Sequence, residues 1–191
     1  MISTYLFDLD DTLIDTSIYR EIYSEVLSKI KEKTDVDIDS LGLKKNKYGN
    51  YDSGELCRSL GLLDLYYSVL ESQIEVKEVL HDSVLELFSL LRKKGKKIGI
   101  VSNSMLRTIK AYVDKYGLEV DFIFSSDLTG CNKDSPEYWK KLIAAEKLDP
   151  EECLVIGDDK LEDVEVPGKL DFQTFYLDNV DKLREVERFI N

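Results

Sequence analysis

The chain has 191 residues, of which 43% are hydrophobic and 34% charged, a composition that fits a soluble protein of one domain, with or without a small insertion. Its net charge of −12 opposes contact with nucleic-acid backbones and anionic membranes, and no apolar run reaches the roughly 18–20 residues that cross a bilayer, so we expect neither partner. The three cysteines form no CxxC pair and there is one histidine, which argues against a disulfide framework, a zinc knuckle and paired-histidine catalysis; chemistry must rest on carboxylates, hydroxyls and lysines.

The first predicted element is a β-strand over the apolar run from Ile2 to Leu9. The segment MISTYLFDLDDTL has no basic region and no small-residue cleavage site, so we expect no signal peptide and a cytoplasmic location. From about Thr16 to about Val79 there is no convincing strand pattern. Apolar residues at helical spacing predict shorter helices over 56–60 and 62–70 and a long helix through Ile18, Ile22, Val26 and Ile30. We therefore predict a helical insertion over residues 16–79.

Beyond this insertion, strand patterns alternate with helical ones. An apolar stripe (Leu80, Val84, Leu87, Phe88 and Leu91) predicts a helix that ends in the basic run before Gly95, since cations and then glycine are typical of a helix C-terminus. Ser135 and Pro136 begin another helix, as its cap and first residue. Four more apolar runs predict strands over 97–102, 121–125, 153–156 and 174–177.

This order of elements predicts an α/β fold with a doubly wound parallel sheet. Residues 1–15 and 80–191 would form this Rossmann-like core, and residues 16–79 would form a small all-helical domain. Ligands of such sheets bind outside the carboxyl ends of the strands. The polar residues that directly follow each predicted strand are therefore the candidates for a functional site.

Two polar groups follow the first two core strands. Asp8-Leu9-Asp10-Asp11-Thr12 follows the first strand, where closely spaced carboxylates repel one another without a cation; an Asx turn or helix cap is the structural alternative. Ser102-Asn103-Ser104 ends the second core strand, and there a helix N-cap formed by Asn103 or Ser104 is the alternative.

Two further groups lie later in the chain. Lys133 precedes a predicted helix and, taken alone, is typical of a solvated surface lysine. Gly157-Asp158-Asp159, followed by Glu162-Asp163, places four acids just beyond the 153–156 strand. A hard divalent cation with oxygen ligands is the natural reason for so dense an acidic group.

Taken in order, these four motifs resemble those of the haloacid dehalogenase superfamily, the aspartate-nucleophile phosphatases and phosphomutases. The matching positions are Asp8, Asp10 and Thr12 (DxDxT), Ser102, Lys133, and Asp158 with Asp163 (GDxxxxD), with Thr174 in register beyond them. KDSPEYW is similar to the family's KPxPxxF, with Asp134 in place of the first proline. Val166 and Asp171 stand where the family often has glycine. These departures leave the subfamily open.

The resemblance implies a phosphoryl-transfer mechanism. Asp8 attacks phosphorus to give an aspartyl-phosphate, and as an ordinary carboxylate it is expected to be ionised at neutral pH. Asp10 protonates the leaving oxygen and later deprotonates the attacking water, which requires a raised pKa. Ser102, Asn103 and Lys133 are expected to bind the phosphate.

The same resemblance implies Mg²⁺ as cofactor. Its expected ligands are Asp8, the backbone carbonyl of Asp10, and Asp158. Asp163, together with Asp159, is expected to orient metal-bound water or Lys133.

The insertion matches the position of a helical cap found in one subgroup of the family. Its Lys44, Lys45 and Arg58 are candidates for contact with an anionic substrate, or else ordinary solvated residues, and the tyrosines Tyr48, Tyr51, Tyr66 and Tyr67 are expected to pack. His81 receives no role. A covered site suits a small phosphorylated metabolite, and we expect a monomer or homodimer.

The leading prediction is a Mg²⁺-dependent phosphatase. A phosphomutase with the same catalytic residues, or a non-catalytic binding or regulatory protein on the same fold, remains an alternative. Asp10 argues against a dehalogenase, which has no alcohol leaving group to protonate.

Overall fold

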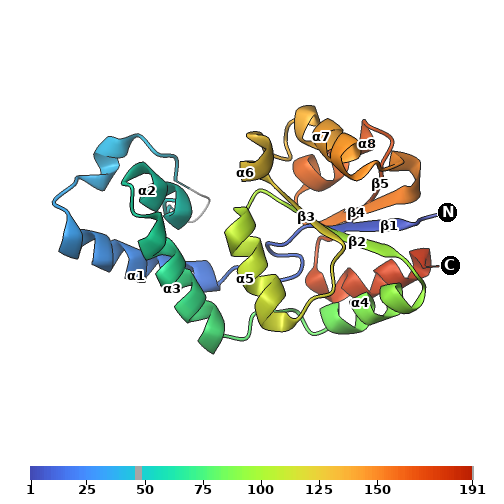
Figure 1. Cartoon of the computed structure of the whole chain (residues 1–191), viewed down its shortest axis with the longest axis horizontal. Helices are drawn as coiled ribbons and strands as arrows, with labels where there is room; N and C mark the ends of the chain where they lie inside the picture. The colour runs from blue at the N-terminus through green and yellow to red at the C-terminus, as the bar shows by residue number, and fades with distance from the viewer. Residues whose placement is uncertain (46–48, 191) are drawn as a thin grey trace. The chain divides into compact units, whose positions relative to one another are not determined.

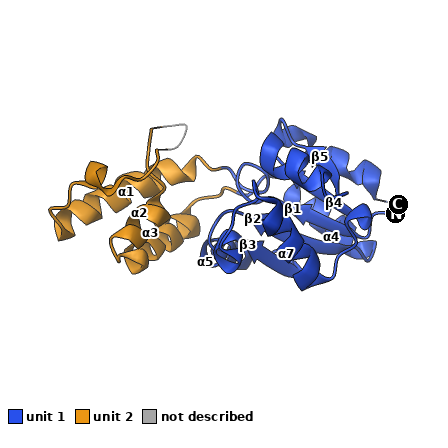
Figure 2. Cartoon of the chain, turned by 90° about the horizontal axis from the view of Figure 1, so that it is seen from above, with its two compact units in different colours: residues 1–15, 80–191 blue, residues 16–79 orange. Residues whose placement is uncertain are grey.

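A computed structural model describes residues 1–45 and 49–190, and the chain divides into two compact units (Figure 2). Met1–Asp15 with Leu80–Asn191 forms the first, here called the core unit, and Thr16–Val79 forms the second, the helical unit. Within the described ranges, every helix is too short or too polar to span a bilayer.

The core unit is built on a five-stranded parallel sheet, in the order β3-β2-β1-β4-β5 (Figure 1). The strands are β1 (Thr4–Phe7), β2 (Lys97–Ser102), β3 (Phe122–Ser125), β4 (Cys153–Gly157) and β5 (Gln173–Tyr176). All five lie within a residue or two of the predicted runs, and the parallel α/β sheet is confirmed. Since all strands run the same way, their carboxyl ends share one edge.

Burial on both faces explains why these strands read as continuous apolar runs rather than alternating ones. In β1, Leu6 points to one face and joins a cluster with Trp139 from α7 (Pro136–Glu146). Phe7 points to the other face and meets Phe88 of α4 (Val84–Lys93), with ring centroids 5.0 Å apart. Tyr5 lies on that second face too, where its hydroxyl donates to the carbonyl of Phe189 near the C-terminus (2.8 Å).

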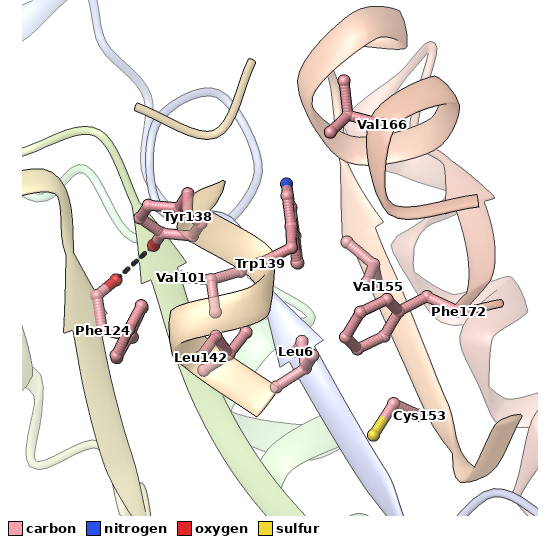
Figure 3. Packing of buried hydrophobic residues seen from close by; sticks show 10 residues of the cluster. All are labelled: Leu6, Val101, Phe124, Tyr138, Trp139, Leu142, Cys153, Val155, Val166 and Phe172. Carbon is pink, nitrogen blue, oxygen red and sulfur yellow. Dashed lines mark hydrogen bonds between the residues drawn. The ribbon is translucent and has the colours of Figure 1, made fainter. Parts of the chain in front are cut away.

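Figure 3 shows the first of these faces, where the aromatic side chains of α7 lie over the central strands. The rings of Tyr138 and Trp139 pack edge to face, and Trp139 packs in the same manner against Phe172. The Tyr138 hydroxyl donates to the carbonyl of Phe124 in β3 (2.6 Å). This packing fixes the first turn of α7 against the sheet, directly after Lys133.

The remaining α-helices of the core unit are α5 (Leu106–Tyr116), α6 (Ser126–Thr129) and α8 (Val166–Gly168). Short helical turns lie at Pro150–Glu152 and Lys160–Glu165, and a ten-residue 3₁₀ helix spans Val180–Phe189. Ser135 caps α7 as predicted, since its hydroxyl accepts from the N–H of Glu137 (3.2 Å). α4 ends before Gly95, which takes the left-handed φ of 66° that glycine tolerates. One detail of the stripe was wrong: Leu80 lies outside α4 and forms a β-bridge with Ile14.

The helical unit contains α1 (Ile18–Lys33), a short turn at Ile38–Leu41, α2 (Ser53–Ser59) and α3 (Leu63–Val76). The predicted stripe of α1 is buried, and α3 runs six residues beyond its predicted end, to Val76, because the buried Ile74 continues its apolar face. Tyr51, Tyr66 and Tyr67 are buried, in line with packing roles, whereas Tyr48 lies outside the described residues. Lys44, Lys45 and Arg58 are exposed, and Lys45 pairs with Asp39 (3.1 Å).

Candidate active site

Asp8 is the first residue beyond β1, and the sheet itself holds it. Its N–H donates to the carbonyl of Ile156 in β4 (2.9 Å), which extends the ladder by one residue, and only 6% of Asp8 is exposed. The chain then turns, and Asp11 takes a left-handed φ of 52°, a conformation that aspartate adopts more readily than most residues. The sheet therefore holds the backbone of Asp8, while Asp10 and Asp11 lie on the turn that follows it.

Lys133 lies within the core unit rather than on its surface. Its ammonium donates to Asp8 Oδ1 (2.5 Å) and to Asp163 Oδ1 (2.8 Å), and its side chain is 2% exposed. Its backbone is fixed on both sides: the N–H donates to Asn103 Oδ1 (2.9 Å), and the carbonyl accepts from Trp139 Nε1 (2.8 Å). The surface-lysine alternative is wrong, because this ammonium joins two motifs that lie far apart in the sequence.

Three carboxylates gather beside this lysine. Oxygens of Asp8, Asp158 and Asp163 all lie within 4.8 Å of one another. Asp163 reaches the group because residue 157 is glycine: a Cβ there would lie 2.2 Å from the Asp163 carboxylate. Such a set of carboxylate oxygens fits a hard divalent cation.

The short helical turn Lys160–Glu165 carries Asp163 to this position. Asp159 caps the turn, since its Oδ1 accepts from the N–H groups of Leu161 (2.8 Å) and Glu162 (3.0 Å). The N–H of Asp159 in turn donates to Asp163 Oδ2 (3.1 Å). The Asp159 side chain thus serves the turn, and the contact with the acidic cluster comes from its backbone.

The segment after β2 contacts three other parts of the site. Ser102 Oγ accepts from the N–H of Ser104 (3.0 Å), and the Ser104 hydroxyl donates to Asp10 Oδ2 (2.7 Å). Asn103 holds the Lys133 N–H with its carbonyl oxygen and donates from Nδ2 to Glu162 Oε2 (2.6 Å). This segment therefore links the first, third and fourth motifs.

The helix-cap alternative for Asn103 and Ser104 is wrong. The N-cap residue of α5 is Met105, and the N–H of Leu106 donates instead to Asp127 Oδ1 (3.0 Å). Because Asp127 supplies the capping oxygen from a distant segment, the two polar side chains before α5 are available for the site.

Burial dominates the electrostatics of these acids. It raises the pKa of Asp8 well above the ordinary range, helped by the nearby Asp163 and opposed by Lys133. Burial, with repulsion from Asp11 and Asp163, raises the pKa of Asp158 to about 6. The expectation of an ordinary aspartate pKa at Asp8 was therefore wrong for the site without a cation, because desolvation disfavours the charged form.

Two other groups titrate away from their ordinary ranges. Burial raises the pKa of Glu162 to about 7, with opposition from Lys133. Burial alone would lower the pKa of Lys133, yet Asp8 and Asp163 together raise it, so the lysine is charged. One fixed positive charge thus faces three carboxylates, and the cluster favours a further cation.

Seven residues that the sequence analysis predicted at one edge of the sheet lie together there: Asp8, Ser102, Asn103, Lys133, Asp158, Asp159 and Asp163. Sequence reasoning counted Glu162 only among the acids of a dense group, gave Ser104 only a possible helix-cap role and gave the Trp139 indole none. Each of these side chains bonds a predicted site residue. Trp139 offered a signal, since an indole N–H must find an acceptor when buried. Asp10 lies outside the three-carboxylate cluster formed by the described residues.

Known proteins resemble this chain in sequence and in fold. The sequence model of the haloacid dehalogenase-like hydrolases matches residues 2–166. A glyceraldehyde 3-phosphate phosphatase of Pyrococcus furiosus is 30% identical over 183 residues, which cover 85% of this chain and 75% of that protein.

Solved structures share the fold as well. The haloacid dehalogenase (HAD) hydrolase YfnB of Bacillus subtilis, solved with magnesium, has a TM-score of 0.70 at 21% identity and covers 100% of this chain and 99% of its own. A HAD phosphatase of Thermococcus onnurineus has a TM-score of 0.70 at 18% identity, covering 97% and 98%.

Proposed function

The chain belongs to the haloacid dehalogenase-like hydrolases, and we propose that it is a Mg²⁺-dependent phosphatase that transfers the phosphoryl group of a small phosphorylated metabolite to Asp8 and then to water. One observation carries the proposal: the buried Lys133 ammonium contacts both Asp8 and Asp163, while Asp158 lies within reach of both acids. A nucleophile, a cationic group and a set of cation ligands thus lie at one point.

Asp8 is suited to in-line attack because the sheet fixes its backbone and Lys133 fixes one of its oxygens. Phosphoryl transfer requires positioning and neutralisation of charge more than covalent chemistry from the protein. The charged lysine opposes the pKa rise that burial imposes on Asp8, and it places a positive charge where phosphoryl oxygens would lie. Ser102 is buried at the end of β2, and its hydroxyl would add a further contact to the phosphoryl oxygens.

The donor set fits the expected cofactor, because Asp8, Asp158 and Asp163 offer three carboxylates and the chain places one lysine among them. When bound, Mg²⁺ would offset the repulsion between these acids and an anionic substrate and would favour the ionised form of Asp8. The pKa of Asp158, which burial and repulsion from Asp11 and Asp163 raise to about 6, supports this, since a bound cation would favour the ionised form of that carboxylate.

Asp10 would act as the acid and base of the reaction. It lies two residues after the nucleophile, on a turn, and its Oδ2 accepts from Ser104. Proton transfer of this kind contributes roughly 10²–10⁴-fold to rate. The helical unit would act as the cap, and an alkyl phosphate of metabolite size is the expected substrate class.

The relative from Pyrococcus furiosus is a glyceraldehyde 3-phosphate phosphatase, so we propose three-carbon sugar phosphates as the first compounds to test. Purified protein would be assayed for phosphate release from glyceraldehyde 3-phosphate and p-nitrophenyl phosphate, with Mg²⁺ and then with EDTA. We expect turnover only with the cation, and a loss of at least about 10³-fold in the Asp8→Asn variant. The exposed Asp181→Asn provides the matched control.

Acid quenching during turnover, followed by peptide mass spectrometry, tests the covalent step. We expect phosphate on the peptide that holds Asp8. Turnover that survives both EDTA and Asp8→Asn would refute the mechanism. Isomerisation of a sugar phosphate without net phosphate release would instead indicate a phosphomutase.

A further inference from the structure

Ser104 makes two contacts that join the nucleophile loop to the end of β2. Its hydroxyl donates to Asp10 Oδ2 (2.7 Å), and its N–H donates to Ser102 Oγ (3.0 Å). The backbone of Ser104 is therefore held by Ser102, and its side chain contacts Asp10. Both contacts lie within the core unit.

We propose that Ser104 is a positioning residue that holds the Asp10 carboxyl for proton transfer, an inference that rests on the proposed phosphatase function. A serine hydroxyl is both a donor and an acceptor. It can donate to Asp10 when that carboxyl is ionised and accept from it when it is protonated. The contact therefore persists through a reaction in which Asp10 changes protonation state twice.

The proton balance shows what this contact serves. In the first half, Asp8 forms a bond to phosphorus, the bond from phosphorus to the leaving oxygen breaks, and that oxygen takes the proton from Asp10. In the second half, a water oxygen bonds to phosphorus, the bond to Asp8 breaks, and the proton from water returns to Asp10. If Ser104 holds the Asp10 carboxyl in one orientation, that carboxyl can reach both the leaving oxygen and the attacking water. Less orientational freedom is then lost at each step.

A structural role for the hydroxyl is less well supported. Ser104 precedes α5 by two residues, but Leu106 at the start of that helix donates to Asp127. The oxygen that caps the Leu106 N–H therefore comes from Asp127 and not from Ser104. We therefore expect removal of the hydroxyl to leave the Leu106 cap, the backbone contact with Ser102 and the ion pairs of Lys133 in place.

The test uses two aryl phosphates that differ in their leaving oxygen. p-Nitrophenolate leaves readily without a proton, whereas the more basic phenolate gains from one, so only phenyl phosphate depends strongly on Asp10 as an acid. In the Ser104→Ala variant we expect kcat/KM for phenyl phosphate to fall about 10–100-fold, and kcat/KM for p-nitrophenyl phosphate to fall no more than about 3-fold. KM for phenyl phosphate and the thermal midpoint should stay close to wild type.

Three further variants sharpen the test. Ser104→Thr keeps the hydroxyl and should recover most of the phenyl phosphate rate. Asp10→Asn should show the same selectivity for the leaving group, and adding Ser104→Ala to it should cause no further loss, because both changes act on one step. Ser59→Ala, in the helical unit, is the matched control, since its hydroxyl donates to the carbonyl of Glu55 (2.9 Å) within α2.

Equal losses on both aryl phosphates, or no loss on either, would overturn the role of Ser104 while leaving the phosphatase proposal intact. An additive loss in the double variant would do the same. A wild-type protein that hydrolyses neither compound with Mg²⁺ would overturn both proposals together.

Discussion

Replacing Lys133 by methionine tests directly whether the charge of this lysine compensates the buried carboxylates of the site. The substitution keeps a side chain of similar length in a fully buried position but removes the charge that contacts Asp8 and Asp163. The two carboxylates, with Asp158 beside them, are then left without their positive partner. We expect Lys133→Met to destabilise the core unit strongly when no divalent cation is present.

The size of the expected destabilisation follows from the burial of this ion pair. Removing one partner of a buried ion pair costs about 3–5 kcal/mol, because the remaining charge is desolvated and uncompensated. With a urea m value of about 2 kcal/mol/M, the midpoint of unfolding should fall by about 1.5–2.5 M. Lys182→Met is the control: Lys182 also contacts a carboxylate, Asp178, but both side chains are nearly half exposed, so we expect no measurable change.

The assay can be restricted to the core unit. The chain has one tryptophan, Trp139, which is buried in α7 against the sheet. Its fluorescence during urea unfolding in EDTA reports on the core unit and not on the helical unit. The destabilisation should shrink at lower pH, because Asp8 and Asp158, whose pKa values are raised, can then take up protons and lose their charge.

A second substitution separates charge from packing. If uncompensated carboxylates cause the loss, Asp8→Asn in the Lys133→Met background should recover part of it, and saturating Mg²⁺ should recover more, since the cation binds only the folded state. A Lys133→Met protein that unfolds in EDTA within about 1 kcal/mol of wild type would refute the reasoning, as would a double variant with simply additive losses.

Three other predictions follow from the site. Because protonation removes ligands, Mg²⁺ affinity measured by calorimetry should fall as the pH is lowered through the Asp158 pKa of about 6, and Asp158→Asn should make that dependence less steep, with the raised pKa of Asp8 accounting for the part that remains. Gly157→Ala should cost about 1–3 kcal/mol and weaken Mg²⁺ binding, because the new Cβ collides with Asp163, whereas Gly168→Ala meets nothing within 4 Å and should be harmless. Trp139→Phe should cost about 1–3 kcal/mol in urea unfolding followed by circular dichroism, since it leaves a buried carbonyl without its donor; an unchanged midpoint would contradict this.

The sheet and the meeting of the four motifs could be predicted because each depends on a strong local signal. A strand buried on both faces must be apolar along its whole length, as in CLVIG, and parallel strands must end at a common edge. Once the strands were placed, Asp8, Ser102 and Asp158 could only lie at that edge. The family resemblance then assigned Lys133 to the same place.

Two of the failures share a physical cause, which is that a distant residue replaced a local partner. Ser104 resembles a helix cap because it precedes α5, but Asp127, which lies beyond β3, supplies the capping oxygen. Leu80 fits the stripe of α4, yet it pairs with Ile14 before the helix begins. No local pattern distinguishes these outcomes, since the choice is made by tertiary contacts between segments.

The charge count of the site suggests an order of binding. Three carboxylates and one ammonium give a net charge of about −2 when all are ionised, which repels a phosphate dianion. Repulsion among these acids also adds to the rise that burial causes in the pKa of Asp8 and Asp158. A divalent cation brings the count to about zero, so Lys133 can then attract phosphoryl oxygens rather than only balance Asp8. We therefore expect inorganic phosphate to bind only when Mg²⁺ is present. Equal phosphate affinity by calorimetry in Mg²⁺ and in EDTA would show that Lys133 alone supplies the anion site.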